Sequence, residues 1–348
     1  MRGTLSKLVF MTFLMAPAYA PCASSDPAVI EAAKKEGRLV RYTTLQADED
    51  LQLSRAFEKI YPFIKTELLP IKGGIALINR LVTEARANVH NADTVTLADS
   101  QFITLKKRDM LLPYLSAASQ SIPEGFKDPQ GYWTGIYRQI MVVAYNTRLV
   151  APAEVPKKYH DLLHPRWKGK ISLDTEDEEW FFALLQIMGE KEGRDFAQKL
   201  SLQSPQYRRG HTLQTLLLGA GEFHIVGNTY NHTVADFKRK GSPVDWIAMQ
   251  PAPARSIGLG IYAGSKNPNA AKLFIDFVAS KEGQMLLRDG FKRVPIRSDV
   301  EADPPSLTKG IQIYPIPADK LGEQQESMAR EYQDIFLRQR FLETELAK

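Results

Sequence analysis

Residues 26–44 read DPAVIEAAKKEGRLVRYTT, which predicts a helix followed directly by a strand. Asp26 can accept hydrogen bonds from the free N–H groups of a first turn, and Pro27 already has a helical φ. Gly37 is a favourable helix stop. From Arg38 to Thr43 polar and apolar residues then alternate, as they do in a strand with one buried face. The stretch is therefore one helix–strand unit.

The same alternation continues on both sides of residue 140. In the first part we expect helices at 50–60 and 75–87, a helix capped by Ser100, and strands at 63–69 and 92–97. In the second part we expect helices at 177–188, 190–200, 212–218 and 232–240, and strands at 170–173, 223–226 and 244–248. Strict alternation predicts mostly parallel sheets flanked by helices. The fold class is thus α/β, with two units.

Two segments are expected to cross between these units. One lies near 138–146 and contains the apolar run Ile140–Tyr145, and the other lies near 249–262 and contains the stiff connector Pro251-Ala252-Pro253. With two crossings the first lobe is discontinuous, so we expect 26–138 plus 258–348 in lobe 1 and 139–257 in lobe 2. Two lobes joined in this way can close like a hinge on a ligand between them.

An amphipathic helix is expected near the C-terminus, over residues 323–341. Its apolar positions recur at helical spacing, which indicates one buried face. We expect this face to pack across the first lobe, with a partner helix as the alternative.

Residues 1–24 have the layout of a Sec-type signal peptide. Arg2 and Lys7 precede an apolar run, Leu8–Met15, that is too short to span a bilayer, and small residues follow it. Cys22 is the only cysteine, and Pro21 before it does not fit a lipid-anchor signal. We therefore expect a periplasmic or secreted protein whose mature chain is a monomer and does not span the membrane.

Composition argues against nucleic acid as a partner. Net charge is +5, and removal of Arg2 and Lys7 with the signal leaves 5 − 2 = +3. Single-strand binders need a basic groove interleaved with aromatic residues, and the sequence shows no such tract. Enzyme motifs are also missing: there is no Gly-x-Ser-x-Gly elbow, no phosphate loop and no metal-protease histidine spacing. A secreted hydrolase or transferase on a similar fold is the alternative of another class.

Several segments, in this order, resemble the periplasmic solute-binding proteins of ABC importers of the iron(III)-transporter type. They are EAAKKEGRLVRYTT (31–44), YWTG (132–135) with Arg138, VVAYNT (142–147), DLLHPRWKGKI (161–171), GAGEF (219–223), GSPV (241–244), NPNAA (267–271) and FIDFVASKEGQ (274–284). The resemblance covers about residues 28–300. It implies a two-lobed type II periplasmic-binding fold, a ligand cleft between the lobes, and ABC permease and ATPase subunits as partners.

The resemblance is weaker at the ligand position. Iron binders of this family carry two adjacent tyrosines after the strand that here ends at Gly227, whereas this chain has Tyr230 followed by Asn231. We therefore expect a small polar ligand, namely an organic anion or an amine-bearing anion such as a phosphonate, phosphate or carboxylate compound. The alternative is Fe(III) as the transported ligand, with Tyr230 as a metal ligand. No cofactor is expected.

The candidate ligand-binding residues lie at strand ends and helix starts, where open α/β sheets bind ligands. In lobe 1 they are Thr43 and Thr44. In lobe 2 they are Asn228, Tyr230 and Asn231, which offer hydrogen-bond donors and acceptors.

Two basic segments are candidates for binding an anion. By the resemblance, Arg138 grips an anion through its guanidinium, with a structural salt bridge as the alternative. Arg209 and His211 precede a helix whose free N–H groups attract anions, with Thr212 as a plain N-cap as the alternative.

The acid-rich stretch 174–179 suits an amine or a cation instead. We expect Thr175 and Trp180 to contact the ligand there, although Trp180 could equally belong to the core.

Overall fold

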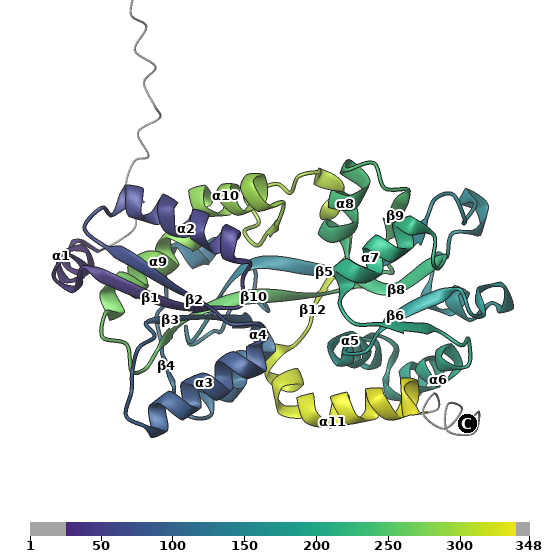
Figure 1. Ribbon diagram of the computed structural model, residues 1–348, viewed down its shortest axis with the longest axis horizontal. Coiled ribbons are helices and arrows are strands. Elements are labelled where there is room, and N and C mark those ends of the chain that lie inside the picture. The colour runs from purple at the N-terminus through teal and green to yellow at the C-terminus, as the bar shows by residue number, and fades with distance from the viewer. Residues whose placement is uncertain (1–25, 339–348) are drawn as a thin grey trace, which may run out of the picture.

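The computed structural model describes residues 26–338 of the 348-residue chain. It has two lobes, each a sheet with helices on both faces (Figure 1). The expected signal peptide, with Cys22, lies outside the described residues. None of the helices in the described part of the chain combines the length and hydropathy needed to cross a bilayer.

The first lobe is built on strands in the order β2-β1-β3-β10-β5. The first three are parallel, while β10 and β5 run antiparallel to their neighbours. Helices α1, α2, α9 and α10 cover one face, and α3 and α4 the other. The bounds are α1 Pro27–Glu36, β1 Arg38–Thr43, α2 Ala47–Ile60, β2 Lys65–Pro70, α3 Gly74–Arg86, β3 Thr94–Ala98, α4 Asp99–Lys106, β4 Leu111–Leu112, β5 Thr134–Asn146, β10 Ala252–Tyr262, α9 Pro268–Ala279, α10 Lys281–Phe291, β11 Val294–Pro295 and β12 Ile313–Pro315.

The second lobe continues from the far half of β5. This half pairs antiparallel with β8 and β9, while β6 lies parallel to β8 and β7. Helices α5 and α6 cover one face, and α7 and α8 the other. The bounds are β6 Ile171–Asp174, α5 Glu178–Met188, α6 Glu190–Ser201, β7 Gln206–Arg208, α7 His211–Ala220, β8 Ile225–Tyr230, α8 Asn231–Arg239 and β9 Val244–Ile247. Short 3₁₀ helices lie at Ala117–Ser121, Pro152–Glu154, Tyr159–Leu163, Pro165–Trp167 and Pro305–Leu307.

Strand β5 belongs to both sheets, and its change of partner marks where the lobes meet. Ile140 is paired with Ala254 of β10 in the first sheet, and the next residue, Met141, is paired with Tyr230 of β8 in the second. Strand β10 begins at Ala252, inside the segment that we expected to be an irregular stiff connector. The pairing of β5 with β10 therefore extends further toward lobe 2 than the prolines suggested.

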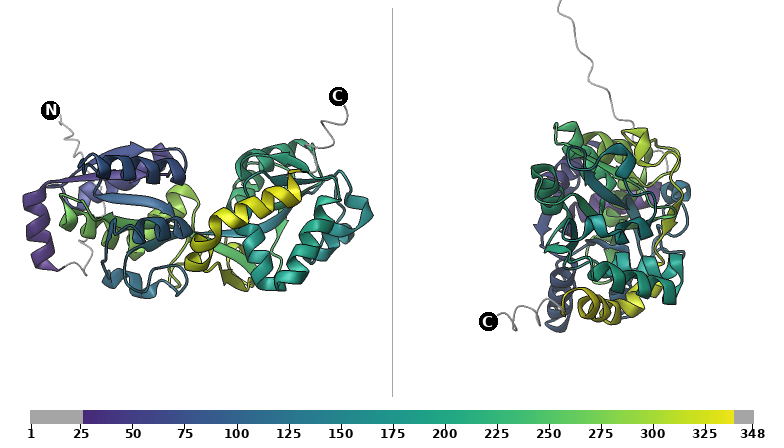
Figure 2. Two further views of the ribbon diagram at one scale, coloured as in Figure 1. Left: turned by 90° about the horizontal axis from the view of Figure 1, so that it is seen from below. Right: turned by 90° about the vertical axis from the view of Figure 1, so that its right-hand side faces the viewer.

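The C-terminal helix α11, Ala318–Phe336, corrects an expectation. We expected a helix at 323–341 that packs across the first lobe. The helix instead begins five residues earlier, touches α4 of the first lobe and then runs along α5 and α6 of the second (Figure 2). Met328, Tyr332 and Phe336 lie in the hydrophobic core of the second lobe, together with residues of α5 and α6.

A buried ion pair attaches α2 to β1 in the first lobe. Arg41 of β1 pairs with Asp50 of α2, and both side chains are at most 1% exposed. Arg41 also donates a 2.9 Å hydrogen bond to Ser54 and lies 3.8 Å above the ring of Phe274. Because Glu49 precedes Asp50, this pair also fixes the first turn of α2 at the edge that faces the second lobe.

We expect Asp50→Asn to reduce the free energy of unfolding by about 3–5 kcal/mol, because it leaves a buried guanidinium without its counter-charge. The double variant Arg41→Met/Asp50→Leu should recover most of this loss, since it removes both buried charges. Urea denaturation of the three proteins measures the effect. Glu67→Gln, which breaks the exposed pair with Arg38, is the control and should change stability far less. Equal effects of Asp50→Asn and Glu67→Gln would contradict this assignment.

Candidate ligand-binding site

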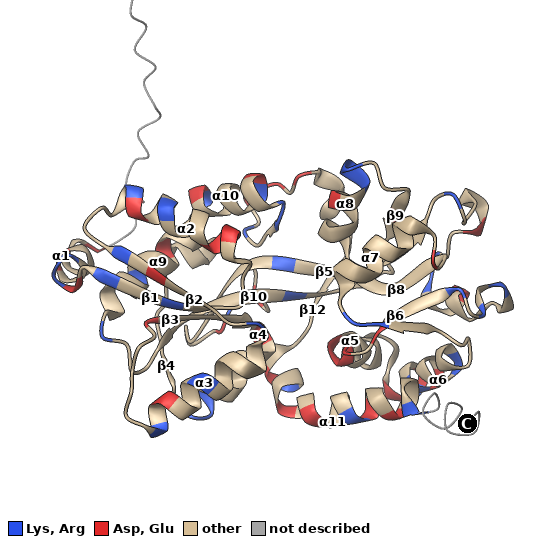
Figure 3. Cartoon of the chain, viewed as in Figure 1, with Lys and Arg blue, Asp and Glu red and all other residues tan. Residues whose placement is uncertain are grey.

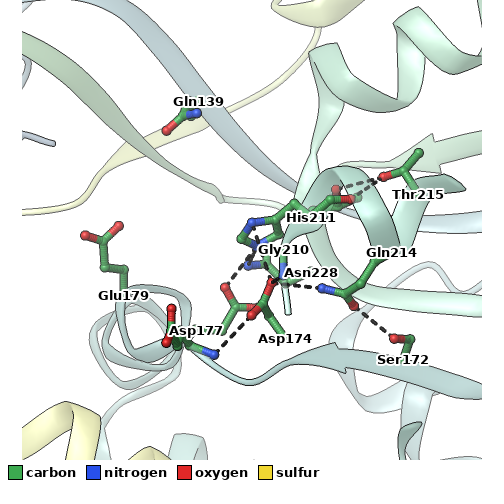
Figure 4. Close-up of polar contacts among 12 residues, drawn as sticks. Gln139, Ser172, Asp174, Asp177, Glu179, Gly210, His211, Gln214, Thr215 and Asn228 are labelled. Atoms are coloured by element: carbon green, nitrogen blue, oxygen red, sulfur yellow. Dashed lines mark hydrogen bonds and ion pairs between the residues drawn. The ribbon is translucent and has the colours of Figure 1, made fainter. Parts of the chain in front are cut away.

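The second lobe presents a cluster of polar side chains at the ends of β6 and β8 (Figure 4). Asp174, the last residue of β6, accepts hydrogen bonds from the backbone N–H of Gly210 at 2.7 Å and from the side chain of Gln214 at 3.1 Å. His211, the first residue of α7, lies 3.0 Å from Asp177 through Nε2 and 3.9 Å from Asp174 through Nδ1. The N-terminus of α7, where we expected an anion to bind, is thus already occupied by the chain's own carboxylate.

The two carboxylates control the charge of His211. Burial alone would lower the pKa of its imidazole, but Asp177 and Asp174 outweigh burial, and the pKa is raised above its usual value of about 6.5. The site therefore has a histidine that holds its proton to higher pH than an exposed one.

Tyr230 ends β8 between two histidine rings. Its ring centroid lies 4.5 Å from that of His211 and 5.8 Å from that of His232, and the guanidinium of Arg255 lies 5.5 Å from it. Burial raises the pKa of the Tyr230 hydroxyl, and the positive charge of Arg255 opposes this rise only in part. The phenol is therefore protonated, and no residue of the described part of the chain is hydrogen-bonded to its hydroxyl.

A second set of contacts joins the lobes next to this cluster. Arg255 of β10 forms an ion pair with Glu179 of α5 and donates a 2.9 Å hydrogen bond to Gln139 of β5. The other oxygen of Glu179 accepts from the hydroxyl of Ser100, on α4 of the first lobe, at 3.2 Å. Figure 3 shows acidic positions at the start of α5 and basic positions on β5 and β10. A carboxylate of lobe 2 is therefore held by groups of the crossing strands and of lobe 1.

Asp99 lies beneath these contacts at the start of α4. Its carboxylate accepts from the backbone N–H and hydroxyl of Ser256 at 2.7 and 3.0 Å. Burial, reinforced by the charge of Glu179, raises the pKa of Asp99 to about 7. The hinge thus contains a carboxyl group that titrates near neutral pH.

A further contact between the lobes lies beside His232, the second histidine next to Tyr230. Arg293 holds Glu49 of α2 through two hydrogen bonds, at 3.0 and 2.7 Å, and lies 3.1 Å from Nε2 of His232 on α8. Because a guanidinium only donates, Nε2 of His232 accepts and the ring is neutral. Burial and the charge of Arg293 lower the pKa of His232 to about 3. Beside them is a hollow of about 300 Å³ between α8 and the end of α10.

Two buried acceptor oxygens in the cluster lack a donor. Asp177 is 4% exposed and Asn228 is 1% exposed, and within residues 26–338 neither Asp177 Oδ2 nor Asn228 Oδ1 has a hydrogen-bond partner. A buried acceptor without a donor costs about 1–3 kcal/mol. Both oxygens lie beside His211 and Tyr230, so the arrangement favours a bound molecule that brings N–H or O–H donors.

Among the residues predicted from the sequence, the structure brings together His211, Asn228 and Tyr230. Thr175 is half-buried next to Asp174, and Arg209 is an exposed residue that pairs with Glu176 at 3.0 Å. Thr43 ends β1 in lobe 1 and Thr44 follows it. The Thr43 hydroxyl accepts from the backbone N–H of Leu45, and the Thr44 hydroxyl donates to the backbone carbonyl of Thr96.

Three predicted residues lie elsewhere. Neighbouring strand residues point to opposite faces, so Arg138 points away from the face on which Gln139 meets Arg255. Its guanidinium donates to the carbonyl of Pro295 at 2.8 Å, and burial lowers its pKa to about 10. Trp180, 1% exposed, belongs to the second-lobe core. The amide of Asn231 donates to the carbonyl of Leu307 at 2.8 Å. Arg138, Trp180 and Asn231 are therefore held by other parts of the chain.

Sequence reasoning missed Arg255, Gln139, Glu179, Arg293 and Glu49. Gln139 and Arg255 lie on the two segments that were predicted to cross between the lobes. The sequence does not give the register of these two strands, which places Gln139 directly opposite Arg255. Arg293 follows α10 and carries no local signal that distinguishes it from other surface arginines.

Among residues 26–338, no group of three or more His, Cys, Asp and Glu side chains is arranged to hold a metal ion. Tyr230 is a single hard donor, and its neighbour Asn231 is held by Leu307.

We expect the imidazole of His211 to titrate above about 6.5 in NMR spectra, and its pKa to fall in Asp177→Asn because one of the two carboxylates is neutralised. A raised folded-state pKa adds stability below the unfolded value of about 6.5, which is lost as pH rises through the folded value. Wild type should therefore exceed Asp177→Asn in stability by more at about pH 6 than at about pH 8.5. A pH-independent difference in urea denaturation would contradict the pairing.

Comparison with known sequences places the chain in a family. A family model described as bacterial extracellular solute-binding protein matches residues 74–323. A Haemophilus influenzae protein described as uncharacterized is 30% identical over 74% of this chain and 78% of its own length. An Fe(3+)-binding periplasmic protein of Serratia marcescens is 26% identical over 62% of this chain and 66% of its own length. A putative 2-aminoethylphosphonate-binding periplasmic protein of Salmonella paratyphi A is 24% identical over 66% of this chain and 68% of its own length.

Solved structures agree with the fold. A Trichodesmium protein (IdiA, FutA) in complex with iron and citrate has a TM-score of 0.74 at 21% identity, and the match covers 86% of this chain and 99% of that one. AfuA of Actinobacillus pleuropneumoniae, with fructose-6-phosphate bound, has a TM-score of 0.72 at 23% identity with the same coverage. The two-lobed α/β fold expected from the sequence is thereby confirmed. The chain belongs to the family of bacterial extracellular solute-binding proteins.

Proposed function

We propose that this protein is the periplasmic solute-binding component of an ABC importer, and that it holds a small polar ligand between its lobes and delivers it to permease and ATPase subunits. The observation that carries the proposal is the pair of buried acceptors without donors, Asp177 Oδ2 and Asn228 Oδ1, beside Tyr230 where the lobes meet. Binding, rather than turnover, is the role of the site.

Closure of the lobes is the proposed mechanism. We take 26–138 plus 258–348 as lobe 1 and 139–257 as lobe 2. By its position in the sequence α11 belongs to lobe 1, although it packs against helices of both lobes. A ligand shifts the lobes toward closure only if it binds the closed state more tightly. Groups from both lobes already meet at Arg255–Glu179–Ser100 and at Glu49–Arg293–His232. The protein would act as a monomer, since each chain supplies both sides of the site.

The proposed ligand is an amine-bearing anion. A protonated amine would donate to Asp177 and Asn228, where donors are lacking, and to the Tyr230 hydroxyl. The guanidinium groups of Arg255 and Arg293 supply positive potential on either side of Tyr230 for the anionic end. The Salmonella paratyphi A relative, which is described as a putative 2-aminoethylphosphonate-binding protein, supports this class.

Fe(III) is the second candidate, because the Serratia relative is described as an Fe(3+)-binding protein. Here the metal would be the transported cargo, with Tyr230 and Asp177 as the nearest oxygen donors. Tyr230 is followed by Asn231 and not by a second tyrosine, and among residues 26–338 no group of three or more His, Cys, Asp and Glu side chains could hold a metal ion. We therefore rank iron below the amine-bearing anion.

The test is native mass spectrometry of freshly secreted protein, followed by calorimetric titration with 2-aminoethylphosphonate and, separately, with ferric citrate. We expect an organic anion to be retained and the phosphonate to bind. Retention of iron, with heat released by ferric citrate alone, would replace the amine-bearing anion by the metal. No binding of a solute of either class, with product formed from one of them, would favour an enzyme.

We expect Tyr230→Phe and Asp177→Asn each to weaken phosphonate binding about tenfold, because each removes a hydrogen bond worth about 1–1.5 kcal/mol. Tyr145→Phe, a half-buried tyrosine at the far end of β5, is the matched control. Arg138→Met should leave affinity unchanged, because Arg138 points away from the site. The assignment of the site fails if Arg138→Met weakens binding and Tyr230→Phe does not.

A further inference from the structure

Helix α11 packs against α4 and α5, the two helices that carry Ser100 and Glu179 beside the candidate site. It contacts α4 of the first lobe and then α5 and α6 of the second. The left view of Figure 2 shows this helix, in yellow, running from the middle of the molecule along the second lobe. Between them, α4 and α5 carry Ser100 and Glu179, the hydrogen-bonded pair that joins the lobes. One helix therefore lies behind both partners of this contact.

At its start, α11 approaches α4 closely through Gly322. A Cβ added at this glycine would lie 2.7 Å from the carbonyl oxygen of Ser100 and 2.7 Å from the Cβ of Ile103. Both distances are too short for real atoms, so only glycine permits the observed approach. The start of α11 is thus seated on the turn that carries the Ser100 hydroxyl.

Toward its end, α11 holds the second edge of the site through Tyr332. This side chain is 1% exposed, and its hydroxyl donates a 2.6 Å hydrogen bond to the backbone carbonyl of Asp174. The ring packs against Phe181 and Phe336, with centroids 6.3 and 4.7 Å away. An adjacent ion pair, Glu331 with Arg194 of α6 at 2.6 Å, fixes the same turn.

Asp174 is the residue through which this contact reaches the site. Its side chain accepts from Gly210 and Gln214 and lies 3.9 Å from His211. Its backbone begins the loop that leads to Asp177. A change at the Asp174 carbonyl would therefore be transmitted to His211 through one residue, although Tyr332 is not itself part of the cluster around Tyr230.

We propose that Tyr332 is a positioning residue for the ligand site. We also propose that α11 is a strut, meaning a rigid helix that sets the distance between Ser100 in lobe 1 and Asp174 in lobe 2. Its buried face could serve core packing alone, but packing requires an apolar ring and not a hydroxyl. The hydroxyl satisfies a backbone carbonyl at the end of β6, where a lost partner would free the loop. The part of this inference that concerns ligand affinity rests on the proposed function.

The first experiment compares Tyr332→Phe with Tyr314→Phe, a half-buried tyrosine of β12. Tyr332→Phe keeps the buried ring and removes only the hydrogen bond to Asp174. We expect it to shift the side-chain ¹⁵N resonances of His211 and to weaken 2-aminoethylphosphonate binding about three- to tenfold. The thermal unfolding midpoint should also fall by a few degrees, because the buried carbonyl of Asp174 loses its donor. The positioning role is overturned if the His211 resonances of Tyr332→Phe match those of Tyr314→Phe, whatever the midpoint.

The second experiment measures the distance between the lobes without any ligand. Spin labels at Lys35→Cys on α1 and Lys199→Cys on α6, in a Cys22→Ser background, report the interlobe distance by pulsed electron resonance. Gly322→Ala should shift or broaden this distribution, because α11 can no longer seat on α4. An unchanged distribution would overturn the strut. If Gly322→Ala does not fold, the Tyr332→Phe comparison decides.

The two proposals fail in different ways. If wild type does not bind 2-aminoethylphosphonate, the proposed ligand class fails, while the His211 resonances and the interlobe distances still test α11. If the phosphonate binds and both α11 variants behave as wild type, the proposed function stands and the strut does not.

Discussion

The antiparallel pairing of β5 with β10 is the constraint on which the rest of the structure depends. These strands run from one sheet toward the other, so their register decides which side chains point to the interior between the lobes. Arg255 lies opposite Gln139 in this register, and their hydrogen bond places a guanidinium within reach of Glu179. If β10 were shifted by one residue, Arg255 would turn away from that face and Ser256 would take its place.

Most of the buried charge between the lobes is balanced within the chain. Arg255 is paired with Glu179 and Arg293 with Glu49, and His211 lies between two aspartates. Each of these charges loses hydration, and each recovers part of the loss from its partner. What remains unbalanced is small and local, namely one oxygen of Asp177, one of Asn228 and the Tyr230 hydroxyl. Such a site can discriminate by hydrogen-bond pattern as well as by charge.

Much of the fold followed from local pattern, since helix–strand alternation and capping residues depend only on near neighbours. The helix from Pro27 and the strand up to Thr43 were confirmed at their predicted ends. The same reasoning could not tell which face of β5 Arg138 occupies, because this strand is largely buried on both faces and its polar and apolar residues do not alternate. The amphipathic pattern of α11 likewise defined its apolar face but not which lobe it covers. Tyr230, His211 and Asn228 could be identified because they end or begin elements whose ends converge; whether they hold the ligand is for the binding measurements to decide.

The carboxylate of Asp174 at the start of α7 has one more consequence. It is attached to the chain, so dissolved phosphate or citrate must displace a tethered competitor before reaching those backbone N–H groups. Because the Asp174 carboxylate is part of the same chain, its effective concentration at these N–H groups is high. Dissolved phosphate or citrate is therefore excluded from the N-terminus of α7 by the Asp174 carboxylate, and a higher concentration of these ions in the surroundings does not by itself place them there.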